Sequence, residues 1–82
     1  MTNENNQRRK SILLQDIFAR NVRIERTKMG VTQEELAAMC GYHRTYIGSV
    51  ERGERNITLA TVEALASAFG VKPYKLLVGS DE

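Results

Sequence analysis

A single glycine between two short helical patterns limits what this 82-residue chain can fold into more than any other feature. The stretch that contains it, QEELAAMCGYHRTYIGSVERGERN, runs from Gln33 to Asn56, with Gly41 between the two patterns. Glycine reverses a chain at little steric cost because it lacks a Cβ and readily adopts a positive φ. We therefore predict two short helices joined by a tight turn, the first of which ends at Gly41.

Both helices carry signals at their first residues. Thr32 and Glu35 have the S/T-x-x-E spacing of a capping box, which predicts that a helix starts directly after Thr32. The second helix is predicted over residues 44–52, with His43 as its N-cap, a weaker cap than Ser or Asp. A helix, a tight glycine turn and a second helix make a helix-turn-helix motif, here over residues 33–52.

Apolar spacing predicts three further helices. Leu14, Phe18 and Val22 recur every four residues and indicate a helix before the motif. Another helix follows Thr58 as its N-cap, and its apolar stripe consists of Leu59, Val62, Leu65, Ala66 and Phe69. Pro73 suits the first turn of a short fifth helix. Because no stretch has the alternating pattern of a strand, the predicted fold is all-α with five helices.

The composition predicts one small domain and excludes several function classes. One Cys and one His leave no partner for an intrachain disulfide and no ligand set for a metal. Without paired carboxylates the chain lacks general acid–base machinery, so we expect neither enzyme activity nor a cofactor. No apolar run approaches the roughly 20 residues that cross a bilayer, and we expect a cytoplasmic protein. Self-association is the expected supplement to so small a core.

The charge is unevenly distributed, although the net charge is only +2. Residues 1–31 carry seven Lys/Arg against three Asp/Glu, whereas the rest of the chain is slightly acidic. Residues 1–11 are polar without apolar periodicity, and we predict a flexible basic arm there. The helix-turn-helix domain is predicted to span residues 12–79, followed by a short tail over residues 80–82.

The second helix of the motif has two different sides. Ile47 and Val50 are three residues apart and are predicted to face the core. The opposite side is predicted to carry Arg44, Thr45, Gly48, Ser49 and Arg52. In DNA-binding motifs of this kind the second helix enters the major groove, where an arginine can bridge O6 and N7 of guanine. Gly48 costs helix stability by about 1 kcal/mol relative to Ala, which a close approach to DNA would explain.

Residues 18–78 resemble the Cro/C1-type (XRE-like) helix-turn-helix family, whose members have a lambda-repressor-like fold. The matching elements are VRIER followed by glycine, TQEELA, RTYIGSVERGERN, and LASAFGV followed by KLL. Within that family, HRTYIGSVERGERNITL is similar to the controller proteins of restriction–modification systems.

This resemblance implies a role for each matched position. The residues that would contact bases are Arg44, Thr45, Tyr46 and Ser49. The residues that would contact the DNA backbone are Thr32, Gln33, His43, Arg52, Arg55 and Asn56. Arg26 and Glu51 match a structural ion pair. The dimer interface implied by the resemblance contains Ile57, Tyr74, Leu77 and Val78.

The implied function is transcription regulation by a homodimer that binds a palindromic operator in double-stranded DNA, as a restriction–modification controller does. An activator of this kind would also contact the sigma subunit of RNA polymerase. Two related alternatives are a phage-type repressor and the antitoxin of a toxin–antitoxin pair. A third alternative, from another class, is a protein-interaction module that uses the same fold without binding DNA.

Overall fold

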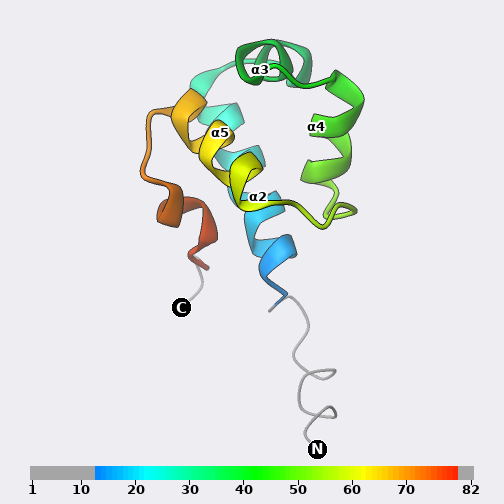
Figure 1. Ribbon diagram of the computed structural model, residues 1–82. Coiled ribbons are helices and arrows are strands. Elements are labelled where there is room, and N and C mark those ends of the chain that lie inside the picture. The colour runs from blue at the N-terminus through cyan, green and yellow to red at the C-terminus, as the bar shows by residue number, and fades with distance from the viewer. Residues whose placement is uncertain (1–12, 80–82) are drawn as a thin grey trace, which may run out of the picture.

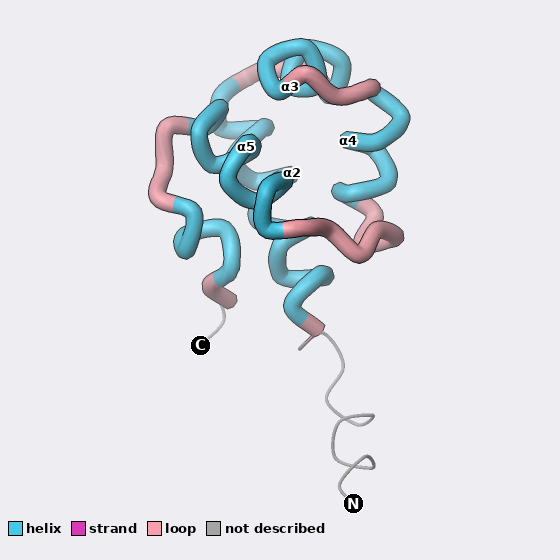
Figure 2. The backbone as a smooth tube through the Cα atoms, viewed as in Figure 1, coloured by secondary structure: helices cyan, strands magenta, loops and turns pink. Residues whose placement is uncertain are grey.

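The computed structural model describes residues 13–79, and this part of the chain is all-α, as predicted (Figure 1). Its elements in chain order are α2 (Leu14–Met29), α3 (Gln33–Cys40), α4 (Arg44–Glu51), α5 (Leu59–Phe69) and the 3-10 helix η1 (Pro73–Leu77). Between residues 13 and 79 helices alternate with loops, and no strand occurs (Figure 2). The predicted arm at residues 1–11 and the predicted tail at residues 80–82 lie outside the described residues.

The fifth predicted helix is a 3-10 helix, so within residues 13–79 the structure has four α-helices and one 3-10 helix, and the prediction of five helices was wrong in this respect. Pro73 is at the first position of η1, and the backbone N–H of Lys75 donates to the carbonyl oxygen of Lys72 over 2.9 Å. Val78, directly after η1, already has an extended backbone. Such i→i+3 turns are the usual form of very short helical segments. Leu76 is fully buried and fixes η1 against the core.

The core lies where the helices meet, with α2 and α5 at the centre of Figure 1, α3 above them and α4 to one side. Its buried apolar side chains come from every element and are Phe18, Val22, Leu36, Ala37, Ile47, Val50, Val62, Leu65, Ala66 and Leu76. Full burial of one large apolar side chain contributes about 1.5–3 kcal/mol. Leu14 belongs to the predicted stripe but is 53% exposed, because it lies in the first turn of α2, at the rim of the core.

Local signals place the two helices of the motif. The hydroxyl of Thr32 accepts from the backbone N–H of Glu35, whose carboxylate accepts from the N–H of Thr32, so the predicted capping box is present. Gly41 has φ of 79° and ends α3 as predicted. His43 is the N-cap of α4 but makes no side-chain capping hydrogen bond. Gly41 and the capping box of α3 therefore define the first helix and the turn after it. The start of α4 has no side-chain cap.

Candidate nucleic-acid interface

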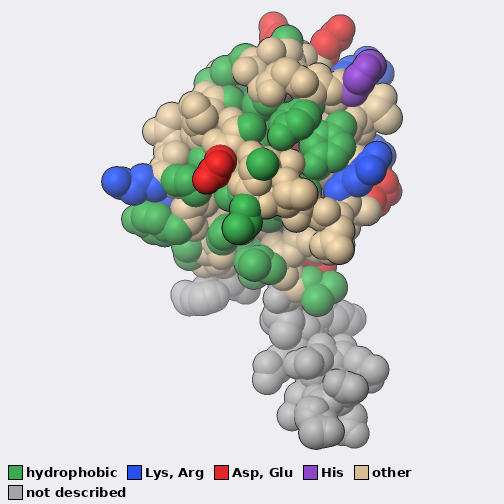
Figure 3. All heavy atoms as spheres, in the orientation of Figure 1, with side chains coloured by type: hydrophobic (Ala, Val, Ile, Leu, Met, Phe, Trp, Pro, Cys, Tyr) green, Lys and Arg blue, Asp and Glu red, His purple; other side chains and the backbone are tan. Residues whose placement is uncertain are grey.

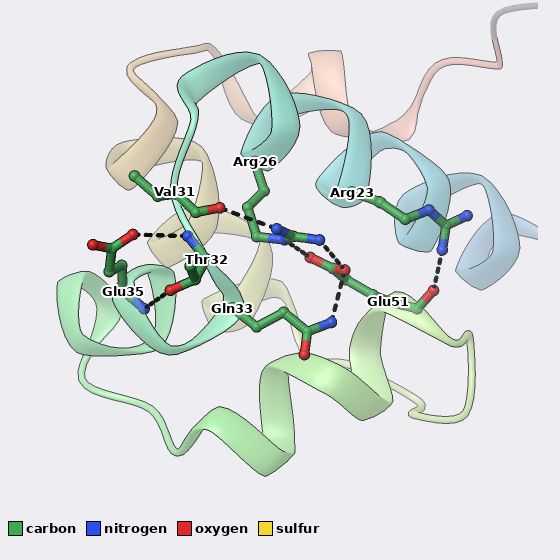
Figure 4. Close-up of polar contacts among 7 residues, drawn as sticks. All are labelled: Arg23, Arg26, Val31, Thr32, Gln33, Glu35 and Glu51. Atoms are coloured by element: carbon green, nitrogen blue, oxygen red, sulfur yellow. Dashed lines mark hydrogen bonds and ion pairs between the residues drawn. The ribbon is translucent and has the colours of Figure 1, made fainter.

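An ion pair with a buried carboxylate and a largely buried guanidinium joins α2 to α4, between the residues that the sequence predicted (Figure 4). The guanidinium of Arg26 donates twice to the carboxylate of Glu51, over 2.6 and 3.1 Å. It donates a third hydrogen bond to the carbonyl oxygen of Val31, at the start of the loop before α3. The hydrogen bond to Glu51 raises the pKa of Arg26. The pair thus fixes the end of α4 against both α2 and the start of α3.

Gln33 and Arg23 complete this network. The side-chain amide of Gln33 donates to the carboxylate of Glu51 over 3.0 Å, so it points toward the ion pair in Figure 4. Arg23 donates to the backbone carbonyl of Glu51, also over 3.0 Å. The sequence suggested no role for Arg23, and it assigned the side chain of Gln33 to a phosphate. In this structure one N–H of the Gln33 amide helps to satisfy a carboxylate that is only 4% exposed, and the phosphate contact stays a prediction.

Arg44 and Thr45 are exposed in the first turn of α4, and His43 is exposed directly before them. Gly48 and Ser49, which were predicted on the same open side, are buried. Ser49 is 5% exposed, and its hydroxyl donates to the carbonyl oxygen of Tyr46 over 2.8 Å. The same hydroxyl accepts from Nε of Arg55 over 2.9 Å. The prediction that Ser49 lies on the open side was wrong, because Arg55 folds back over it from the loop after the helix.

Gly48 is also buried rather than open. A Cβ atom at this position would lie 3.2 Å from Nη1 of Arg52 and 3.5 Å from Oε1 of Gln33. The first of these atoms is the tip of an exposed side chain and the second lies at ordinary contact distance, so a small shift of Arg52 would accommodate a Cβ. Gly48 is thus covered by side chains of the same molecule rather than open, but this packing alone does not require a glycine.

Tyr46 is half-buried and packs against the core. Its hydroxyl lies 3.1 Å from the hydroxyl of Thr61 on α5, so the ring points inward instead of toward solvent. The guanidinium carbon of Arg55 lies 5.4 Å from the centre of the Tyr46 ring. The sequence offered no signal for Thr61, which is one residue from the apolar stripe of α5 and outside the motif.

Arg52 and Asn56 are exposed beyond α4. Arg52 pairs with Glu54, with 3.0 Å between the guanidinium and the carboxylate. The hydrogen bond raises the pKa of Arg52 and lowers the pKa of Glu54. Exposed ion pairs of this kind are weak, so Arg52 can exchange Glu54 for another anion.

Two of the predicted dimer residues, Ile57 and Leu77, line an apolar groove of about 310 Å³ at the opposite end of α5 from Gly70, together with Leu14 and Leu59. The other two, Tyr74 in η1 and Val78 directly after it, are outside that lining and are 59% and 53% exposed. The space-filling view shows hydrophobic side chains gathered over the face in front of α5, with positively charged side chains at its edges (Figure 3).

Two negative findings apply to residues 13–79. Within that part of the chain, no helix is long and apolar enough to cross a membrane. The same residues contain no group of three or more His, Cys, Asp or Glu side chains placed to hold a metal ion.

Comparisons with known proteins agree with this geometry. The model of the helix-turn-helix family matches residues 22–76. Control protein C.SmaI of Serratia marcescens is 52% identical over 64 residues, which cover 78% of this chain and 76% of that protein. The structure of the restriction–modification controller protein C.AhdI from Aeromonas hydrophila has a TM-score of 0.73 at 40% identity, and the match covers 76% of this chain and 94% of that chain.

A third similar protein was solved on DNA. Controller protein C.Esp1396I, a tetramer in complex with its natural 35 base-pair operator, has a TM-score of 0.72 and 30% identity. The match covers 78% of this chain and 84% of that chain. Because the family model spans more than half of the sequence, the chain belongs to the helix-turn-helix family of DNA-binding transcription regulators, in which it is similar to restriction–modification controller proteins.

Proposed function

We propose that the chain is the controller protein of a restriction–modification system and binds a palindromic operator as a homodimer. The observation that carries this proposal is the exposed start of α4, with Arg44 and Thr45 free of the packing that holds the rest of the helix. The similarity to C.SmaI and C.AhdI supports the assignment to controllers. As a regulator of this family, the chain is not an enzyme.

The proposed DNA surface has two parts. Arg44 and Thr45 would contact base edges in the major groove, with Arg44 donating two parallel hydrogen bonds to a guanine. The residues that would contact backbone phosphates are Thr32, His43, Arg52, Arg55 and Asn56, all of them exposed. Ser49, Tyr46 and Gln33 would support this surface from within the protein, since their polar groups are engaged in intramolecular hydrogen bonds.

The proposed dimer would cover the apolar groove between the first turns of α2 and α5. Leu59, which is 77% exposed, lines this groove, and Tyr74 of η1, outside the lining, is 59% exposed. A small core gains from such association, and a two-fold dimer matches the symmetry of a palindromic operator. A regulator of this kind would act in the cytoplasm, and the sigma subunit of RNA polymerase would be its partner if it activates transcription.

Titration against DNA tests the proposal. The protein is titrated onto a duplex from upstream of its own gene and onto a scrambled duplex of equal length. We expect tighter binding to the upstream duplex, and Arg44→Ala should remove about 1–3 kcal/mol of that binding while relaxing the preference at one base pair per half-site. Arg55→Ala is the control, because loss of a phosphate contact should weaken binding about equally on both duplexes.

Equal losses on the two duplexes for Arg44→Ala would show that Arg44 contacts phosphate instead of bases. Failure of the parent protein to bind either duplex would favour the protein-interaction module. The neighbouring genes separate the remaining alternatives, since an endonuclease and a methyltransferase gene indicate a controller, whereas a toxin gene indicates an antitoxin.

A further inference from the structure

The buried hydroxyl of Thr61 on α5 is within hydrogen-bonding distance of two tyrosine hydroxyls, that of Tyr42 in the turn and that of Tyr46 in α4. Thr61 is 4% exposed, and its Oγ1 lies 3.1 Å from the hydroxyl of Tyr46 and 3.3 Å from the hydroxyl of Tyr42. A third hydroxyl, that of Thr58, lies 3.4 Å away. A threonine hydroxyl can donate once and accept twice, so three partners use its full capacity. Thr61 thereby ties both tyrosines to α5, a helix outside the helix-turn-helix motif.

The guanidinium of Arg55 in turn lies over the ring of Tyr46. The guanidinium carbon of Arg55 lies 5.4 Å from the ring centre, within the range of a cation–π interaction. Nε of Arg55 also donates to Ser49, whose hydroxyl donates to the backbone of Tyr46. Two contacts to one turn of α4 therefore hold an exposed arginine. Because this bond uses only Nε, the N–H groups of the terminal guanidinium nitrogens are not consumed by it.

We propose that Thr61 is a positioning residue for DNA binding, which holds Arg55 in place for a phosphate through the ring of Tyr46. The inference rests on the proposed DNA-binding function and adds to it a residue that does not touch DNA. An arginine that is already ordered loses less rotamer freedom when it binds phosphate than a freely moving one. Tyr46 then contributes to DNA binding indirectly: its hydroxyl is hydrogen-bonded to Thr61, and the face of its ring orders Arg55. It is not a direct ligand of the bases.

The test uses Thr61→Val, which keeps the size of the side chain and removes the hydroxyl, and Thr61→Ser, which keeps the hydroxyl. Both are made in the full chain, with and without Arg55→Ala. Binding to the duplex from upstream of the protein's own gene should weaken by about three- to tenfold per DNA-contacting subunit for Thr61→Val, the range expected when one long side chain loses its ordering. Thr61→Ser should bind as the parent does. In the Arg55→Ala background, Thr61→Val should have almost no further effect.

A second readout needs no DNA. The face of an aromatic ring shifts the NMR signals of protons above it to higher field, so the side-chain protons of Arg55 report on its place over Tyr46. In free Thr61→Val these signals should move toward the values of a solvent-exposed arginine, and in Thr61→Ser they should stay where the parent has them.

Four results would decide against the inference or its basis. Unchanged Arg55 signals in Thr61→Val would overturn it, and so would an equal loss of affinity in the presence and absence of Arg55, which indicates a general loss of stability. A parent protein that binds neither the upstream nor the scrambled duplex would refute the proposed function itself. A parent that binds DNA while Thr61→Val binds equally well would refute only the role of Thr61.

Discussion

Arg26 and Arg52 both pair with glutamates, but the surroundings of the two pairs differ. The side chain of Glu51 is only 3% exposed and receives hydrogen bonds from Arg26 and Gln33, whereas the side chains of Arg52 and Glu54 are both more than half exposed. A buried carboxylate that loses its cation keeps its desolvation cost without the compensating attraction. The first pair is therefore part of the fold, and the second is a surface contact that water and salt can replace.

Arg26→Ala should accordingly destabilise the protein strongly, by about 3 kcal/mol, the lower end of the range for a broken buried pair, because Gln33 still donates to Glu51. Urea unfolding followed by circular dichroism measures the loss. Arg52→Ala is the matched control and should leave the unfolding midpoint nearly unchanged. If Arg26→Ala were no less stable than Arg52→Ala, the ion pair would not hold α2 against α4.

At the scale of the elements, the two helices of the motif begin differently. α3 has a complete capping box at Thr32, whereas α4 begins after His43, whose side chain makes no capping hydrogen bond. His43 nevertheless has the extended backbone of an N-cap, with φ −79° and ψ 146°. A serine there could accept from an N–H of the first turn without any change in the backbone.

His43→Ser should therefore stabilise the protein, by about 0.5–1 kcal/mol, while Thr32→Ala should destabilise it by about 1 kcal/mol. Thermal unfolding at a fixed protein concentration compares the two variants with the parent. A His43→Ser variant that melts below the parent would indicate that the imidazole already stabilises α4, contrary to its lack of a capping bond.

At the scale of the whole molecule, exposed apolar residues surround the groove where we propose that a second copy packs. Leu59 is the first residue of α5, directly after its cap Thr58. A carboxylate in the first turn of a helix interacts favourably with the helix dipole. Leu59→Glu should therefore keep the monomer folded while it places a charge in the proposed interface.

Sedimentation should show Leu59→Glu as a monomer at concentrations where the parent is a dimer, because an unpaired charge is costly to desolvate. Circular dichroism checks that the variant is folded. Ser67→Glu, at an exposed position near the opposite end of α5 and outside the lining of the groove, adds the same single negative charge and is the control that should leave the parent's association unchanged. A folded Leu59→Glu variant that remains a dimer would locate the interface elsewhere.

The sequence was sufficient to predict the helices of the motif and one contact between helices, the Arg26–Glu51 ion pair. The capping box and Gly41 predicted where α3 begins and ends, and Thr58 predicted the start of α5. The resemblance to a family predicted the Arg26–Glu51 pair that the structure contains. The short fifth helix predicted from Pro73 is a 3-10 helix, a form that short helical segments often take. The assignment of Ser49 to the open side was wrong, because helical spacing says nothing about what the next loop covers.

What the sequence by itself determined is local. Caps, positive-φ glycines and apolar spacing act within a few residues of the chain, so they can be recognised before any tertiary contact is known. Only the tertiary structure decided which polar groups remain free for a partner. Gln33 donates to Glu51, 18 residues away, and Tyr46 meets Thr61, 15 residues away. Hydrogen bonds between such distant positions depend on how the helices pack, and that packing leaves Arg44 exposed while it engages Gln33 and Tyr46 inside the protein.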